Sequence, residues 1–310
     1  MTPIAEYRYF DEMCQLIDIH GNPDPLMRLL RFDTPTGPHL GWLQGDTVLD
    51  LSRGAPAVTD VAQWLALDPP QQQALRRQAE SQPRRPLAGL VLRRPVAQPG
   101  KLVCLGLNYH DHAAEGGNAA PEYPAFFLRG STSLLDPGAP LQRPRCSDKL
   151  DFEAELAVVI GSTARGRTLE DALTCVGGYS IFNDGSLRDY QRRSTQWTIG
   201  KNFDATGPLG PWVVTPDELP AGASGLCIQS RLNGQVMQDA NTRLMITSVA
   251  QAIVHLSEVM TLEVGDVIAM GTPAGVGYAR KPPVFMRHGD TIEIEIEGIG
   301  ILSNPVEDAA

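Results

Sequence analysis

The pattern of hydrophobic positions predicts mainly β-structure from about residue 100 onward. Short apolar runs rich in β-branched residues predict strands at residues 102–107, 153–160, 212–215, 227–232, 266–270 and 291–296. The pair Asn233-Gly234 follows one of these runs and favours a type I′ turn, which predicts a hairpin. Helical spacing is found at residues 248–259, but few helices separate the strands. A mostly antiparallel or mixed β-fold is therefore favoured over a Rossmann sheet, and no G-x-G-x-x-G motif supports a dinucleotide site.

The first third of the chain has a different pattern. Three short strands are predicted between Met27 and Leu51, separated by Pro/Gly and Gly-Asp turns, and a helical pattern covers residues 59–80. A Pro- and Arg-rich stretch at residues 83–99 is typical of a domain boundary. We therefore expect an N-terminal extension at residues 1–25, a small α/β accessory domain at 26–95 and the main domain at 96–310.

Composition narrows the classes of function. The 310 residues carry a formal net charge of -10, which argues against a nucleic-acid groove. No apolar run reaches membrane-spanning length, and the N-terminus lacks a signal-peptide core. The five cysteines show no C-x-x-C spacing, which favours reduced thiols over a disulfide framework or a zinc site. These features predict a cytoplasmic protein that binds neither nucleic acid nor membranes.

Three acidic residues, Asp151, Glu153 and Glu155, alternate along one predicted strand. Alternation would place all three carboxylates on one face, where like charges repel and resist burial. A divalent cation such as Mg²⁺ or Mn²⁺ would remove that penalty. Asp184, at the end of a later apolar run, could complete a cation site with Glu153 and Glu155. The alternative is a solvated strand face whose acids pair with Lys and Arg.

A second polar group follows the strand predicted at residues 102–107. His112 and Glu115 are three positions apart, so on a helical turn they share one face. A Glu beside a His orients the imidazole and raises its basicity, as activation of water requires. An exposed polar turn is the simpler explanation for such a pair, and it is the one we adopt for His110 and Asp111. The small residues at 116–120 predict a mobile segment that could cover a site.

Further candidates lie downstream. Arg188 and Gln191 follow Asp184 on a predicted helical turn, and an Arg there is suited to a substrate carboxylate. Lys201 could stabilise a developing enolate, although a surface lysine is the simpler alternative. The Gly-rich loop after Met270 could present Thr272 and backbone N–H groups to an anion.

The order and spacing of these motifs resemble the fumarylacetoacetate hydrolase superfamily. The resemblance covers about residues 101–304 and rests on the runs GLNYHDH, DFEAELAVVIG, FND…RDYQ, GKNFD, GPW and GTPAGVG. It implies a mixed, β-rich α+β fold, a β-sandwich roll with a small N-terminal accessory domain, that is usually homodimeric. It also implies a Mg²⁺ or Mn²⁺ site formed by Glu153, Glu155 and Asp184, so that Asp151 is not a ligand.

The same resemblance implies roles for the other candidates. His112 and Glu115 match a water-activating dyad and Lys201 a catalytic lysine, while substrate-contacting positions are matched by Arg188, Gln191 and Thr272. One position departs from the pattern, because Arg129 stands where members often have Lys.

The activity implied is metal-dependent hydrolysis of a C–C bond in a ketonic substrate. A 2,4-dioxo acid such as an acylpyruvate or fumarylpyruvate, as found in aromatic catabolism, would be cleaved through a metal-stabilised enolate. Lyases of the same family (decarboxylases and dehydratases) and isomerases remain open, since they use the same enolate. A metal-binding member without turnover is the alternative outside enzymes.

Overall fold

The computed structural model describes residues 27–117, 119 and 121–310. The predicted extension at residues 1–25 and Cys14 lie outside the described residues. The described cysteines, Cys104, Cys146, Cys175 and Cys227, are free thiols, as expected. Within the described part of the chain, no helix is long and apolar enough to cross a membrane.

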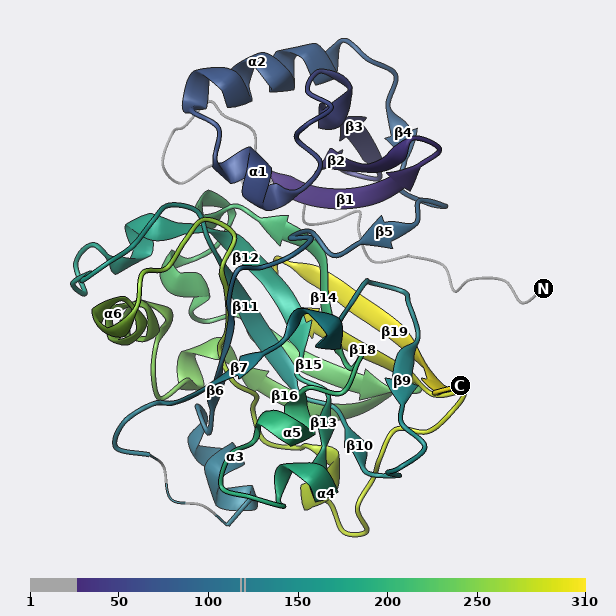
Figure 1. Cartoon of the computed structure of the whole chain (residues 1–310), viewed down its shortest axis with the longest axis vertical. Helices are drawn as coiled ribbons and strands as arrows, with labels where there is room; N and C mark the ends of the chain where they lie inside the picture. The colour runs from purple at the N-terminus through teal and green to yellow at the C-terminus, as the bar shows by residue number, and fades with distance from the viewer. Residues whose placement is uncertain (1–26, 118, 120) are drawn as a thin grey trace.

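The N-terminal part is a small layer of strands covered by two helices (Figure 1). Strands form at the three predicted places, but the helical pattern at 59–80 divides into two helices. The division has a local cause, because Asp68 caps a new helix whose first residues are prolines. The elements are β1 (Arg28–Thr34), β2 (Gly37–Gln44), β3 (Thr47–Asp50), α1 (Val61–Leu65), α2 (Pro69–Glu80), β4 (Arg85–Pro86) and β5 (Leu92–Arg93).

These strands continue the main sheet of the molecule. Its strand order is β4-β3-β2-β1-β14-β12-β11-β17-β6-β7, with β5 beside β1 and β8 beside β14. The sheet is mixed, because β17 and β6 are parallel whereas most neighbours are antiparallel. Its further strands are β6 (Leu102–Gly106), β7 (Ala125–Arg129), β8 (Leu134–Leu135), β11 (Ala154–Ile160), β12 (Val176–Asn183), β14 (Gly207–Val214) and β17 (Val267–Ala269).

A five-stranded sheet packs against one face of the main sheet. Its order is β16-β15-β18-β19-β9, and the β15–β16 hairpin turns at Asn233 and Gly234, both with positive φ, as predicted. A two-stranded pair, β10 and β13, lies near the short helices α4 and α5 (Figure 1). The elements are β9 (Leu141–Arg143), β10 (Leu150–Asp151), β13 (Ser186–Leu187), β15 (Cys227–Leu232), β16 (Gln235–Asn241), β18 (Thr291–Ile296), β19 (Gly300–Asp308), α3 (His110–Glu115), α4 (Arg188–Gln191), α5 (Thr198–Lys201) and α6 (Val249–Val259).

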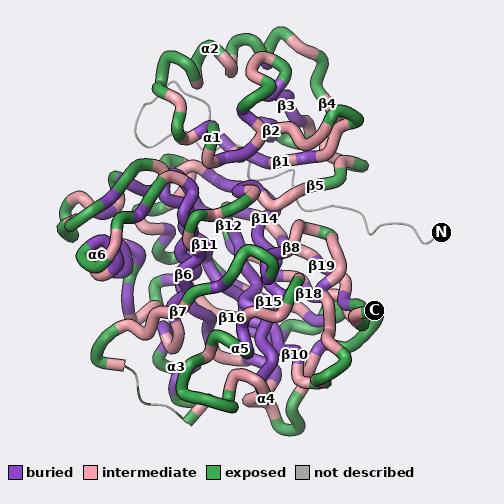
Figure 2. The backbone as a smooth tube through the Cα atoms, viewed as in Figure 1, coloured by how far each residue is buried: buried purple, intermediate pink, exposed green. Residues whose placement is uncertain are grey.

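Hydrophobic side chains fill both faces of the main sheet. Strands β11 and β12 are buried along their whole length and form the centre of the molecule (Figure 2). One cluster of buried hydrophobic side chains joins one face of β11 and β12 to α6 and the five-stranded sheet. A second cluster joins the other face to the N-terminal strands and helices. The result is the mixed, sheet-rich α+β fold that the sequence predicts.

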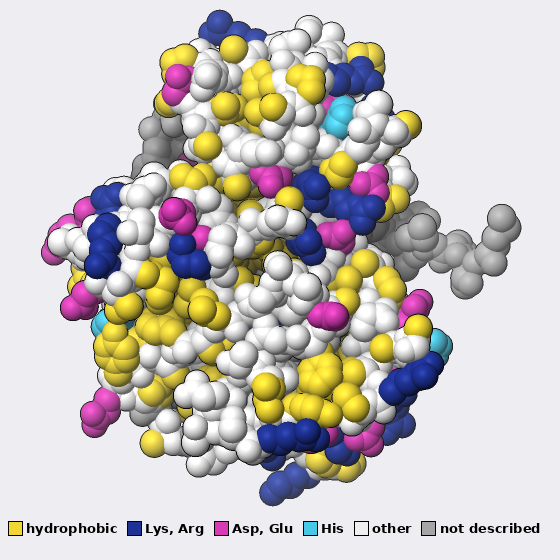
Figure 3. Space-filling model, in the orientation of Figure 1, with side chains coloured by type: hydrophobic (Ala, Val, Ile, Leu, Met, Phe, Trp, Pro, Cys, Tyr) yellow, Lys and Arg dark blue, Asp and Glu magenta, His cyan; other side chains and the backbone are white. Residues whose placement is uncertain are grey.

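The junction between the N-terminal strands and the main body is also charged. Lys and Arg side chains lie beside acidic ones there on the face shown in Figure 3. Arg93 pairs with Asp33 at 2.5 Å and with Asp136 at 2.9 Å. Part of the Arg-rich linker therefore ties β1 to the loop after β8.

Candidate metal site

Three buried carboxylates meet at one end of β11 and β12. Glu153, Glu155 and Asp184 each offer an oxygen within 4.8 Å of the others. Antiparallel pairing of Ala154 with Asn183 brings the start of β11 to the end of β12, which places the acids together. The Asp184 amide donates to the Glu153 carbonyl at 3.0 Å and fixes this junction.

The alternating acidic stripe is only partly as predicted. Strand β11 begins at Ala154, so Glu153 precedes it, and Asp151 belongs to the separate strand β10. Asp151 accepts hydrogen bonds from the backbone amides of Phe152, Gly277 and Tyr278 instead of joining the carboxylate cluster. The prediction that all three acids share one strand face is therefore wrong.

Lys201 lies against two of the clustered acids. Its Nζ is 2.5 Å from Glu153 Oε2 and 2.6 Å from Asp184 Oδ2. Burial alone would lower the pKa of Lys201, but Asp184 and Glu153 outweigh that effect and raise it. The lysine is charged and is not the surface residue of the simpler alternative.

Arg129 holds the other side of Asp184. Its fully buried guanidinium donates to Asp184 Oδ1 at 2.5 Å, to the Gly185 carbonyl and to the Thr206 hydroxyl at 2.8 Å. The sequence left the role of this position in doubt. In the structure Arg129 orients one of the three acids.

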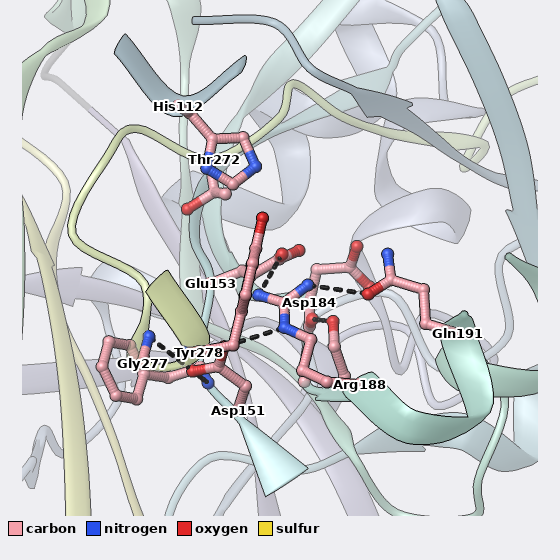
Figure 4. Close-up of polar contacts among 12 residues, drawn as sticks. His112, Asp151, Glu153, Asp184, Arg188, Gln191, Thr272, Gly277 and Tyr278 are labelled. Atoms are coloured by element: carbon pink, nitrogen blue, oxygen red, sulfur yellow. Dashed lines mark hydrogen bonds and ion pairs between the residues drawn. The ribbon is translucent and has the colours of Figure 1, made fainter. Parts of the chain in front are cut away.

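Arg188 connects Glu153 to Asp151 and Gln191 (Figure 4). Its Nε donates to Asp151 Oδ2 at 2.8 Å and its Nη1 donates to Gln191 Oε1 at 2.9 Å. Its Nη2 forms an ion pair with Glu153 Oε1 at 2.6 Å, but the angles are not those of a hydrogen bond. Burial alone would raise the pKa of Glu153, but Arg188 and Lys201 hold it below its usual range. Arg188 is thus engaged mainly by protein acceptors.

Glu155 is the least compensated of the three acids. It accepts one hydrogen bond from the Gly271 amide at 3.0 Å. Burial, followed by the nearby charges of Asp184 and Glu153, raises the pKa of Glu155 well above its usual value. An all-oxygen set with one poorly neutralised carboxylate fits a hard divalent cation such as Mg²⁺ or Mn²⁺.

His112 and Glu115 form a hydrogen-bonded pair on α3. His112 Nδ1 lies 2.9 Å from Glu115 Oε1, and Glu115 Oε2 accepts from the Gly275 amide at 2.8 Å. The chain enters α3 through Leu107, whose φ of 57° turns it away from β6. Because Nδ1 faces the carboxylate, Nε2 is the ring nitrogen left for chemistry.

A cavity of about 500 Å³ brings the candidates together. Thr272 lines it and accepts a hydrogen bond from the Gln238 side chain at 2.7 Å. Every site residue predicted from the sequence except Glu115 lines this cavity, and Glu115 reaches it through His112. These lining residues are His112, Glu153, Glu155, Asp184, Arg188, Gln191, Lys201 and Thr272.

Several lining residues were not predicted. Phe127, Trp197 and Tyr278 supply aromatic walls, and Arg192 lies at the same cavity. Tyr278 stacks on Arg188, and the guanidinium carbon lies 4.4 Å from the centroid of the tyrosine ring. An isolated aromatic residue carries no motif, so the sequence held no signal for them. The predicted covering segment at 116–120 includes positions 118 and 120, which lie outside the described residues.

The fold and site together define a class of protein, a β-rich enzyme type with a carboxylate cluster beside a histidine–carboxylate pair. The fumarylacetoacetate (FAA) hydrolase C-terminal family matches residues 101–307, two thirds of the chain. The chain belongs to the fumarylacetoacetate hydrolase superfamily.

Similar proteins carry more than one activity in their names. Oxaloacetate tautomerase FAHD2A, mitochondrial, of Bos taurus is 38% identical over 292 residues, covering 92% of this chain and 93% of the bovine protein. The solved structure of a fumarylacetoacetate hydrolase from Exiguobacterium antarcticum matches with a TM-score of 0.79 and 34% identity, covering 91% of this chain and 100% of that one. A 5-carboxymethyl-2-hydroxymuconate delta-isomerase from Mycobacterium smegmatis matches with a TM-score of 0.73 and 34% identity, covering 92% and 100%.

Proposed function

We propose that the chain is a metal-dependent tautomerase that interconverts the keto and enol forms of a 2-oxo acid such as oxaloacetate. The observation that carries the proposal is the His112–Glu115 pair at the same cavity as three clustered carboxylates. The bovine relative named as an oxaloacetate tautomerase supports the choice of reaction. The specific hydrolase predicted from the sequence becomes the second candidate.

The reaction needs a base and a stabilised enolate. A divalent cation held by Glu153, Glu155 and Asp184 would supply Lewis acidity toward the 2-oxo acid. His112 Nε2 takes a proton from the carbon next to the keto group, and the enolate oxygen gains one, so substrate and product differ only in the place of a proton. Glu115 holds the imidazole through Nδ1 while this occurs.

Lys201 and Arg188 shape the charge around the carboxylates. Lys201 contacts Glu153 and Asp184, and Arg188 pairs with Glu153; these two cations hold the pKa of Glu153 below its usual range. Ionised acids are the form that binds a cation.

C–C hydrolysis of an acylpyruvate is the second candidate. A histidine oriented by a carboxylate can equally take a proton from water, which would then attack the distal carbonyl. The structural likeness to a fumarylacetoacetate hydrolase favours this reading. The two reactions differ in products, because only hydrolysis releases pyruvate.

One assay separates them. The enol absorbance of oxaloacetate and of a panel of acylpyruvates is followed with Mg²⁺, Mn²⁺ or a chelator, and pyruvate and CO₂ are quantified. We expect metal-dependent acceleration of oxaloacetate enol decay, above the spontaneous rate, without either product. Pyruvate from an acylpyruvate would support hydrolysis, and CO₂ from oxaloacetate would move the reaction to the decarboxylases.

The expected homodimer and cytoplasmic location stay predictions. The bovine relative is named as a mitochondrial protein, so its location does not support the cytoplasm for this chain.

A further inference from the structure

Arg192 differs from the other cationic side chains at the cavity. Arg188 and Lys201 are buried, and each lies against protein carboxylates. Arg192 also lines the cavity, but it is exposed and forms an ion pair with none of the residues that the structure describes. Its charge is therefore available to an anion that enters the cavity.

A stacking contact holds Arg192 close to Arg188. The Arg192 guanidinium carbon lies 4.6 Å from the Tyr278 ring centroid, and that of Arg188 lies 4.4 Å from the same centroid. The two guanidinium carbons are thus separated by no more than the sum of these distances. The Tyr278 amide donates to Asp151 Oδ2 at 3.0 Å, which fixes the backbone that carries the ring.

We propose that Arg192 binds the second carboxylate of a dicarboxylic 2-oxo acid and so selects such acids over those with a neutral end. The inference rests on the proposed function, which places the 2-oxo acid head at the carboxylate cluster. A four-carbon dicarboxylate has its two carboxyl groups only three bonds apart, so its second carboxylate stays within the cavity that Arg192 and the cluster both line. Arg presents a planar pair of donors that matches a carboxylate, whereas an apolar acyl group offers it no acceptor.

Equilibrium binding tests the proposal without turnover. Malate and 2-hydroxybutyrate share a carbon skeleton and a 2-hydroxy acid head, and they differ by the terminal carboxylate. Their binding to the Mg²⁺-loaded protein is measured by calorimetry for the wild type, Arg192→Met, Arg192→Lys and Arg193→Met. Arg193 is the matched control, because it carries the same charge one position on but stacks on Tyr190 and does not line the cavity.

We expect Arg192→Met to weaken malate binding about tenfold or more and to leave 2-hydroxybutyrate binding unchanged. The malate affinity of Arg192→Lys should lie between those of the wild type and Arg192→Met. Arg193→Met should bind both ligands with the affinity of the wild type. Equal weakening of both ligands in Arg192→Met, an effect of the same size in Arg193→Met, or no preference of the wild type for malate would each overturn the proposal.

Failure of the proposed function can be distinguished from failure of the Arg192 subsite by measuring both turnover and binding. If oxaloacetate is not turned over but malate binding still depends on Arg192, the tautomerase assignment is wrong and the carboxylate subsite stands. If oxaloacetate is turned over with an unchanged KM in Arg192→Met, the subsite is wrong and the tautomerase stands.

Discussion

At the scale of single residues, the site depends on side chains that hold one another in place. His112 takes its orientation from Glu115, and Glu115 is held in turn by the Gly275 amide. Asp184 is held from two sides, by Arg129 and by Lys201. Each chemical group thus has a neighbour that fixes its direction, which is what proton transfer over short distances requires.

Replacing His112 by Ala should remove the base and leave the cation site intact. We expect kcat to fall by about 10²- to 10⁴-fold, the usual contribution of a positioned general base. Metal affinity, measured by calorimetry, should stay the same because His112 is not one of the clustered acids. The control is His110→Ala, on the same helix but exposed. Loss of metal binding in His112→Ala would contradict the assigned roles.

Replacing Glu155 by Gln should stabilise the metal-free protein and weaken its binding of metal. Burial and its acidic neighbours raise the pKa of Glu155, so its charged form is disfavoured in the folded protein, and a neutral amide should raise the melting temperature in chelator. Metal affinity should fall at least about tenfold, since even supporting residues around a metal ligand contribute that much. The melting temperature is measured against Mg²⁺ concentration, with the exposed Glu258→Gln as control. A lower melting temperature of Glu155→Gln in chelator would contradict the argument.

At the scale of elements, one buried side chain joins three segments around the site. Asn108 donates to the Thr247 carbonyl at 3.0 Å and to the Met270 carbonyl at 2.7 Å, and it accepts from the Thr247 amide at 2.7 Å. These bonds connect the start of α3, the entry to α6 and the end of β17. Helix α3 carries His112, so its position depends on Asn108.

Replacing Asn108 by Ala should therefore affect both stability and catalysis. Buried backbone groups would lose their partners, and we expect the free energy of unfolding to fall by about 2–4 kcal/mol. Asn108→Asp should lower the free energy of unfolding at least as much, because a carboxylate would face the carbonyl oxygens of Thr247 and Met270. Denaturant titration measures the stability, and kcat should fall in parallel. A fully stable Asn108→Asp protein would show that the three bonds do not hold these segments.

The sequence predicts elements well where their cause is local. Strands β15 and β18 form at the predicted residues, because the apolar pattern of each lies within its own few positions, and β15 ends directly at the Asn233-Gly234 turn. The carboxylate cluster was also predictable, since its acids occur at strand ends. Other contacts join segments more than 80 positions apart: Tyr278 stacks on Arg188, and the backbone amides at residues 277–278 donate hydrogen bonds to Asp151. No local pattern encodes such contacts.

At the scale of the whole molecule, the N-terminal strands share a sheet and a core with the main body. Leu29 of β1 pairs with Val213 of β14, and both belong to the cluster that includes Val159 of β11. The boundary predicted near residue 95 therefore crosses continuous packing. Such packing favours one cooperative unit over two independent ones.

We expect the full chain to unfold in a single calorimetric transition. Replacing the buried Leu29 by Ala should cost about 2–5 kcal/mol and shift that whole transition to lower temperature. The ratio of calorimetric to van 't Hoff enthalpy should stay near one. A separate early transition in the variant would show instead that the N-terminal strands unfold alone.

The position of the cavity has a consequence for how this chain can diverge. All residues that line it fall between Leu105 and Tyr278. Three of the elements that contribute to it, α3, α4 and α5, lie at the end of the molecule away from β1, β2 and β3 (Figure 1). We therefore expect mutations in the N-terminal strands to act through folding. Mutations in α4, between α4 and α5 and near Tyr278 change the lining of the cavity, and we expect them to act on what it binds. Relatives that accept different acids should differ most in these short segments, around an unchanged carboxylate cluster.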